Sequence, residues 1–361
     1  MKSEVEQKID KIARGILDDV KSYTAPVLLT PVRSLSNVEF NKIDGYFKIK
    51  DSVKKRTLTA STIKTFAQTL RMMALSKDLV KSEDTATKRE AYYVSKNWGD
   101  ARFSEQPESD AVMDDIEAML GVNREQMGFI PGEHGGSVAG ALTVIDEDFE
   151  TKSELKIDCT KFGSGAYSIP SSVEHLKFET KAKFILAIET QGAFERLNKH
   201  KYWQKSNCIL IAMSGVPTRA CRRFIRKLSD DNKLPVYVFT DGDPYGYGNI
   251  YRTLKVGSGN AAHINQYFCV PQAIFLGVTP GDIDAYDLPT HPLKDIDLKK
   301  IKDMLKNDPF IKEHKEWQKA LQKMAKSKVR VEQQAFAAHG LNMVIDKYLP
   351  EKIKNQKSWL P

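Results

Sequence analysis

The stretch Val236–Gly246, VYVFTDGDPYG, places two aspartates, Asp241 and Asp243, just after a short apolar run. The run itself, VYVF, is typical of a buried β-strand. Three similar apolar runs alternate with segments of helical character: Phe184–Ile188, Cys208–Met213 and Ala273–Val278. Strands that alternate with helices predict a parallel sheet covered on both faces.

An acidic residue also ends the first apolar run, because Glu189 directly follows FILAI. Ligands of an open α/β sheet bind beyond the carboxyl ends of its strands. If the two strands are neighbours, then Glu189, Asp241 and Asp243 share one small volume, and a cation must balance their charge. Mg²⁺ prefers such oxygen ligands and leaves positions open for phosphate oxygens. The pattern therefore predicts a phosphate-handling magnesium site.

A purely structural interpretation of the two aspartates stays open. The sequence from Asp241 to Pro244 is also compatible with a turn into a helix at Tyr245, with Asp243 favoured by the helix dipole. A phosphatase of the haloacid dehalogenase type has a similar pair of aspartates, but there the pair follows the first strand and is usually followed by Thr or Val. The glutamate at the end of an earlier strand favours the metal site.

The bulk composition sets the class of protein. The chain has 361 residues, which suits about two domains. Its net charge of +8 and pI of about 9.0 allow a polyanionic partner. It contains no apolar run of about 18 residues and no secretory signal, so we expect no membrane association. The four unpaired cysteines suggest reduced thiols and a cytoplasmic location.

The remainder of the chain is expected to be largely helical. Apolar spacing predicts helices over residues 5–20, 61–80 and about 110–120, the last ending at Gly121. The glycine-rich loop Pro131–Gly140 separates this part from the alternating strands and helices, and the lysine-rich residues from Leu298 onward are again helical in pattern.

A glutamate on one strand and DxD on a later one resemble the Toprim pattern, the metal site shared by topoisomerases, bacterial-type primases and some nucleases. Longer stretches are similar to the A subunit of DNA topoisomerase VI, with the archaeal form a closer likeness than its meiotic double-strand-break relative. These stretches are TDGDPYG, SGVPTRACRRFIRKL, ATKREAYY, FLGVTPGDIDAYDLP and KVRVEQQAF. Together with FSEQPESDAVMDDIEAMLGVNREQMGFIPG, they cover the chain from about Thr57 to about Gly340.

This resemblance implies a fold of class α/β plus α+β. It implies an N-terminal winged-helix domain, catabolite-activator-like, followed by a Toprim α/β domain with a parallel sheet. On this basis we expect an N-terminal extension at 1–55, the winged-helix domain at 56–140, and the Toprim domain with C-terminal helices at 141–361.

The resemblance also implies a nucleophile. In the family motif a basic pair precedes two residues and a doublet ending in tyrosine, and here these are Lys88, Arg89 and the pair Tyr92 and Tyr93. Tyr93 would form the 5′-phosphotyrosyl link, while Tyr92 packs. If the segment is helical, Arg89 shares the face of Tyr93 and can bind phosphate or stabilise an oxyanion. Without the motif, both tyrosines would be read as core aromatics.

Partners follow from the same likeness. We expect double-stranded DNA as the substrate and a location at the nucleoid. We also expect a homodimer in which the tyrosine of one protomer meets the acids of the other. No GxxxxGK[ST] occurs in the sequence, so ATP-driven passage and relaxation of supercoils would need an ATPase subunit of GHKL type, in an A₂B₂ heterotetramer. The helix over 5–20 is a candidate docking element for that subunit, or packs on its own domain.

Four arginines occupy one expected helix after the second strand: Arg219, Arg222, Arg223 and Arg226. With Lys88 they are candidate DNA contacts, or else a solvated helix face. His134 and His263 are interpreted as structural or surface residues. Other functions stay open: a Toprim nuclease or primase-like enzyme with water or a nucleotide as attacker, a DNA-binding scaffold with a degenerate metal site, or a meiotic-type break-forming protein.

Overall fold

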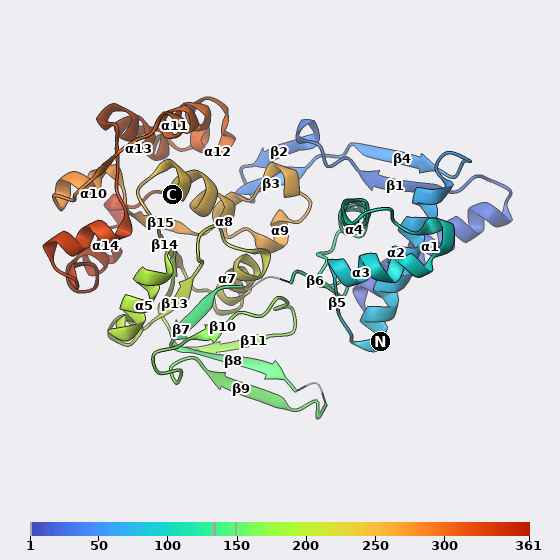
Figure 1. Ribbon diagram of the computed structural model, residues 1–361, viewed down its shortest axis with the longest axis horizontal. Helices are drawn as coiled ribbons and strands as arrows, with labels where there is room; N and C mark the ends of the chain where they lie inside the picture. The colour runs from blue at the N-terminus through green and yellow to red at the C-terminus, as the bar shows by residue number, and fades with distance from the viewer. Residues whose placement is uncertain (1, 133–134, 149) are drawn as a thin grey trace. The chain divides into compact units, whose positions relative to one another are not determined.

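The computed structural model describes residues 2–132, 135–148 and 150–361 (Figure 1). The chain packs into two compact units. The first contains Met1–Glu39, Phe47–Glu133 and Ser258–Tyr267, and the second contains Phe40–Tyr46, His134–Gly257 and Phe268–Pro361. The expected boundaries at 55/56 and 140/141 stay predictions, but these units group the first 39 residues with the segment that carries Tyr93.

The first unit is mainly helical. Its elements and those of the hairpin that leads out of it and back are α1 (Glu4–Lys21), β1 (Val27–Pro31), β2 (Val38–Asn41), β3 (Tyr46–Ile49), β4 (Val53–Thr57), α2 (Ile63–Ser82), β5 (Ala86–Thr87), α3 (Lys88–Val94), α4 (Gln106–Leu120) and β6 (Phe129–Ile130). The helices predicted over 5–20, 61–80 and 110–120 are thus confirmed as α1, α2 and α4, and Gly121 ends α4 in the left-handed conformation.

The second unit begins with strands and ends with helices. Its elements are β7 (Ser137–Gly140), β8 (Leu142–Glu147), β9 (Glu154–Asp158), β10 (Tyr167–Ser168), β11 (Lys177–Thr180), β12 (Phe184–Ile188), α5 (Gln191–Lys199), α6 (Tyr202–Ser206), β13 (Cys208–Ala212), α7 (Arg219–Asn232), β14 (Val236–Phe239), a π-helical stretch (Gly246–Tyr251), α8 (Arg252–Val256), β15 (Ile274–Gly277), α10 (Pro280–Ala285), β16 (His291–Pro292), α11 (Asp295–Asn307), α12 (Pro309–Glu313), α13 (Lys315–Ser327), β17 (Val329–Arg330) and α14 (Leu349–Lys354). The short helix α9 (Asn265–Phe268) lies where the chain passes from the first unit to the second. Short helical turns complete the chain: Leu35–Asn37, Ser95–Asn97, Gly99–Ala101, Gly259–Ala261, Gln333–His339, Val344–Tyr348 and Gln356–Ser358.

The main sheet of the second unit has the strand order β10-β7-β13-β12-β14-β15 in the part of the chain that the structure describes. The four strands from β13 to β15 are parallel, whereas β7 and β10 pair antiparallel at one edge. These four are the strands predicted from the apolar runs. Strand β12 has β13 on one side and β14 on the other, so the crossover from β13 to β14 passes over it.

Burial on both sides of this sheet explains why its strands are uniformly apolar. Every residue of β12 and β13 is buried. Alternate residues such as Leu186 and Leu210 join a core with Phe194 of α5 and with Phe336 and Tyr348 from the C-terminal part. Figure 1 shows the C-terminal helices α10–α14, in orange and red, gathered beside β14 and β15. Within the described residues, no helix is long and apolar enough to cross a membrane.

Candidate functional site: carboxylates at two strand ends and an exposed tyrosine

Glu189 and Asp241 lie at the carboxyl ends of two adjacent strands. Strands β12 and β14 pair in parallel, with Ile188 opposite Phe239, so that the residues following both strands emerge at one edge of the sheet. The Glu189 N–H donates to the Phe239 carbonyl at 3.0 Å. The adjacency that the sequence left conditional is therefore confirmed.

The Glu189 carboxylate bonds to the backbone of Asp241. The Asp241 N–H donates to Glu189 Oε2 at 2.8 Å. Glu189 is only 8% exposed. Burial, reinforced by the nearby Asp241, raises the pKa of Glu189 to about 7, and burial likewise raises the pKa of Asp241 to about 6. Both groups are thus held where their charged forms are costly unless a cation is near.

Gly242 is needed at this turn because other chain segments approach it closely. Its φ is not positive, so left-handed backbone is not the reason for a glycine here. A Cβ there would lie 2.5 Å from Val331 Cγ1 and 2.8 Å from the Val278 carbonyl oxygen. Its N–H donates to the Val331 carbonyl at 2.8 Å, so the segment after β17 lies directly along the Asp241–Asp243 turn.

Asp243 has two partners of its own. Its Oδ1 accepts from the Gly246 N–H at 2.6 Å, as in the alternative that placed this residue at a helix start. Its Oδ2 lies 3.7 Å from Arg330 Nη1. Among the described residues, no three His, Cys, Asp or Glu side chains gather closely enough to hold a metal ion. The three-acid ligand set therefore stays a prediction, and the pair Glu189 and Asp241 is what the structure brings together.

The chemistry of this pair fits Mg²⁺. The ion is commonly held by one or two carboxylates and keeps several waters, so a formed cage of three acids is not required. The raised pKa values of Glu189 and Asp241 mark two acids, one buried and one half-buried, whose charged forms are disfavoured by desolvation. Nearby, the Nε atom of Arg330 is buried and has no hydrogen-bond partner among the described residues.

Tyr93 is exposed on the short helix α3 of the first unit. Thr87 caps this helix, since its hydroxyl accepts from the Glu90 N–H, while the Glu90 carboxylate accepts from the Thr87 N–H. The Tyr93 side chain is 56% exposed. Tyr92 packs against the core of the unit and donates its hydroxyl to the Ser104 carbonyl at 3.2 Å. The expected division, one tyrosine packed and one open, is what the structure has.

The two basic residues before the tyrosines differ in their surroundings. Because α3 covers Lys88–Val94, Arg89 lies one turn before Tyr93 on the same face, and it is exposed. Lys88 instead forms an ion pair with Asp110 of α4 at 2.6 Å. Of the two, Arg89 is the one placed to reach a phosphate beside Tyr93.

The four arginines of α7 have partners within the chain. Arg223 makes two 2.7 Å bonds to Glu174, and Arg226 donates to the Cys269 carbonyl at 2.7 Å. The guanidinium groups of Arg219 and Arg222 lie 4.6 and 5.6 Å from the centre of the Phe268 ring. DNA contact by these residues stays a prediction that the structure does not strengthen, because each one packs or bonds within its unit.

The remaining candidates are structural or cannot be described. The His263 side chain is 6% exposed, with Nε2 3.6 Å from the Glu117 carboxylate, in line with a structural role. His134 lies outside the described residues. All four cysteines are buried.

Two residues of the site were missed by sequence reasoning. Arg330 lies against Asp243, and the Gln333 N–H donates to Asp241 Oδ1 at 2.8 Å. Both belong to the stretch KVRVEQQAF, which pointed to the family but gave no spatial information. Ninety-two residues separate Gln333 from Asp241, so only the fold could place them together.

The fold and the site define a class of protein. A parallel sheet with a glutamate after one strand and DxD after its neighbour is a Toprim arrangement, and the family model for the Toprim domain of Spo11 and of the topoisomerase 6 A subunit matches residues 184–353. Two more models match upstream: "All-beta domain in DNA topoisomerase VI alpha subunit" over 132–182 and "Type IIB DNA topoisomerase" over 64–129.

Relatives that match nearly the whole chain identify the family within this class of Toprim proteins. The chain is 54% identical to the A subunit of type 2 DNA topoisomerase 6 from Methanocaldococcus jannaschii, covering 99% of this chain and 96% of the relative. The protein of the same name from Methanothermobacter thermautotrophicus is 37% identical, over 96% of this chain and 96% of the relative. The one from Halobacterium salinarum is 34% identical, over 97% of this chain and 96% of the relative. The chain belongs to the family of A subunits of type IIB DNA topoisomerases, enzymes of the isomerase class.

Proposed function

We propose that this chain is the DNA-cleaving and religating subunit of an ATP-dependent type IIB topoisomerase that acts on double-stranded DNA. One observation carries the proposal: the buried Glu189 and the half-buried Asp241 lie at the ends of adjacent parallel strands, and the Asp241 N–H donates to the Glu189 carboxylate. Membership of the family, whose Toprim topoisomerases are generally Mg²⁺-dependent, supports it.

Tyr93 is the nucleophile in this proposal. Its phenolic oxygen loses its proton to solvent and attacks the phosphorus of a backbone phosphodiester, and the bond from phosphorus to the 3′ oxygen breaks. That oxygen takes a proton and leaves as a 3′-hydroxyl, while the phosphorus stays bound to Tyr93 as a 5′-phosphotyrosyl group. Resealing reverses these steps without new energy input, because the linkage keeps the phosphodiester energy. Arg89, one turn earlier on α3, offers its charge to the phosphate oxygens.

The residues that we propose to hold Mg²⁺ are Glu189 and Asp241, with Asp243 beside them. The bound ion supplies Lewis-acid stabilisation of charge on the phosphate. The chain's own residues prepare the site: the Asp241 N–H orients Glu189, and Arg330 balances the charge of Asp243.

We further infer that the first unit contains a winged-helix domain, catabolite-activator-like, and that the active form is a homodimer. Tyr93 and the carboxylates belong to different compact units, which suits a site completed by a second copy of the chain. In such a dimer the tyrosine of one protomer would act with the acids of its partner. Two such half-sites would cut both strands and so allow another duplex to pass.

An ATPase B subunit of GHKL type would drive this passage in an A₂B₂ assembly. Only the second half of helix α1 is free to serve as a docking element for the B subunit. Val5 and Ile9 are buried in the core of the first unit, whereas Leu17 and Val20 near the end of the helix are about half exposed. The second half of α1 therefore offers an apolar surface for the partner.

The proposal is tested by the covalent adduct. Purified chain with its B subunit, Mg²⁺, ATP and supercoiled DNA is stopped with detergent, and protein bound to 5′ ends is measured. We expect adduct from the wild type and from Tyr92→Phe, because the Tyr92 hydroxyl only bonds the Ser104 carbonyl. We expect none from Tyr93→Phe.

Other outcomes would favour other functions. Metal-dependent cutting that survives in Tyr93→Phe would contradict the proposal and favour a Toprim nuclease. DNA binding without cutting by the wild type in any metal would favour a scaffold.

A further inference from the structure

Gln333 bonds to both strand ends that carry the acids. Its Nε2 donates to the carbonyl of Phe239, the last residue of β14, at 2.9 Å. Its Oε1 accepts from the hydroxyl of Thr190, the residue after Glu189, at 2.8 Å. Its main-chain N–H donates to Asp241 Oδ1 at 2.8 Å. One residue thus connects the end of β12, the end of β14 and one carboxylate.

The partners show why this residue is a glutamine. The Phe239 carbonyl can only accept, so the NH₂ group must face it, and the amide oxygen is then left for the Thr190 hydroxyl. A glutamate in place of Gln333 would put a carboxylate oxygen next to the Phe239 carbonyl oxygen, and two acceptors cannot form a hydrogen bond. Methionine, of similar shape, would make neither bond. The link therefore needs a donor and an acceptor at the end of one side chain.

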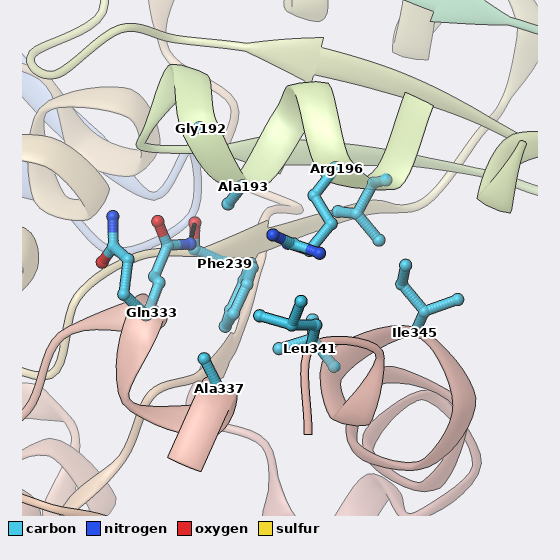
Figure 2. Close-up of a pocket in the computed structure, with 11 residues that line it drawn as sticks. Gly192, Ala193, Arg196, Phe239, Gln333, Ala337, Leu341 and Ile345 are labelled. Carbon is cyan, nitrogen blue, oxygen red and sulfur yellow. Dashed lines mark hydrogen bonds between the residues drawn. The ribbon is translucent and has the colours of Figure 1, made fainter. Parts of the chain in front are cut away.

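Hydrogen bonds, more than close packing, hold Gln333 in place. The residue is 3% exposed, but a pocket of about 240 Å³ lies beside it and beside Phe239. Figure 2 shows Gln333 and Phe239 on one side of this pocket, opposite Leu341 and Ile345. Because this side is hollow, loss of the side-chain bonds would leave the two strand ends with less restraint on their relative position.

The backbone around Gln333 is fixed independently of its side chain. Val331 and Gly242 exchange two hydrogen bonds, with lengths of 2.8 and 3.2 Å, which hold this segment along the Asp241–Asp243 turn. A substitution at Gln333 should therefore keep the main-chain bond to Asp241. It would remove only the side-chain link between Thr190 and Phe239.

We propose that Gln333 is a positioning residue for metal binding: its side chain sets the spacing of the Glu189 and Asp241 carboxylates. This role rests on the proposed function, in which these acids hold Mg²⁺. Residues that orient metal ligands in this way commonly contribute about 10–100-fold to metal affinity.

The test is Mg²⁺ titration of the full-length chain by calorimetry, with Gln333→Met compared with Gln334→Met. The control is the same substitution one residue later, at an exposed glutamine. We expect Gln333→Met to bind Mg²⁺ about 10–100-fold more weakly and Gln334→Met to match the wild type. In the assembled enzyme, Gln333→Met should need more Mg²⁺ for half-maximal cleavage and recover its rate when Mg²⁺ is saturating.

A second pair of variants tests the hydrogen bond between Gln333 and Thr190 by changing Thr190, in case Gln333→Met does not fold. Thr190→Ser keeps the hydroxyl, and Thr190→Val removes it, so only the latter should weaken Mg²⁺ binding. If folded Gln333→Met or Thr190→Val binds Mg²⁺ as tightly as the wild type while Glu189→Ala has lost binding, the positioning role is wrong and the metal site stands. If Glu189→Ala also binds normally, the metal site itself is wrong, and this role with it.

Discussion

The helix that carries Tyr93 and the strand ends that carry the acids are built in opposite ways. Helix α3 has seven residues, is fixed by one capping box, and leaves Tyr93 and Arg89 open. Glu189 and Asp241 are instead held by several hydrogen bonds: the Glu189 N–H donates to the Phe239 carbonyl, the Asp241 N–H to the Glu189 carboxylate, and the Gln333 N–H to Asp241 Oδ1. The difference suits the roles that we propose: an exposed tyrosine can reach a bulky substrate, whereas restrained carboxylates keep a spacing suited to a small ion.

The largest effect should come from removing an acid. Glu189→Ala or Asp241→Ala should abolish DNA cleavage, because each removes a ligand at a strand end. The fold should persist, since neither side chain belongs to the apolar core. Adduct assays with circular dichroism check both points, and loss of the folded state in either variant would instead indicate a structural role.

An effect of intermediate size on the rate of adduct formation should distinguish Arg89 from Lys88. Arg89→Ala should lower the rate of adduct formation about 10²-fold, as for loss of one group that stabilises a transition-state charge. Lys88→Ala should lower it much less, because Lys88 already pairs with Asp110. Single-turnover rates at saturating DNA measure the difference, and equal losses in both variants would remove the special role given to Arg89.

The smallest effect concerns stability. Because the pKa of Glu189 is raised to about 7, the metal-free folded chain binds this proton more tightly than the unfolded chain, so stability falls as pH rises from about 4.5 to 7. Glu189→Gln should avoid that loss and stabilise the metal-free protein by about 1–3 kcal/mol at pH 8, with no gain near pH 4.

Thermal unfolding with and without Mg²⁺ checks this prediction. Added Mg²⁺ should raise the melting temperature of the wild type at pH 8 but not that of Glu189→Gln. A variant less stable than the wild type at pH 8 would show that the carboxylate is not strained in the absence of metal.

The strands and the adjacency of Glu189 and Asp241 could be predicted from sequence because both follow from local rules. Strands covered on two faces must be apolar throughout, as in FILAI and VYVF, and the carboxyl ends of adjacent parallel strands share an edge. Tyr93 needed the resemblance to a known family, because nothing in the chemistry of a YY pair separates a nucleophile from a core aromatic.

Long-range contacts could not be predicted in the same way. The sequence placed the four arginines of α7 on one helix, but Glu174 and the Cys269 carbonyl, which bind Arg223 and Arg226, are distant in sequence. Likewise the need for glycine at position 242 comes from the close approach of Val331, which no local pattern reveals. The fold had to be known before the role of Gln333 could be inferred.

The central claim, that Tyr93 and the carboxylates are two halves of one cleavage site, is tested most directly with heterodimers isolated through two different tags. One pairs a Tyr93→Phe chain with a Glu189→Ala chain, and the other pairs the wild type with a chain carrying both substitutions. If each site combines the tyrosine of one protomer with the acids of its partner, the first heterodimer nicks DNA and becomes linked to a 5′ end, and the second does neither. Nicking by the second alone would place both groups on one protomer, and no nicking by either would contradict the account.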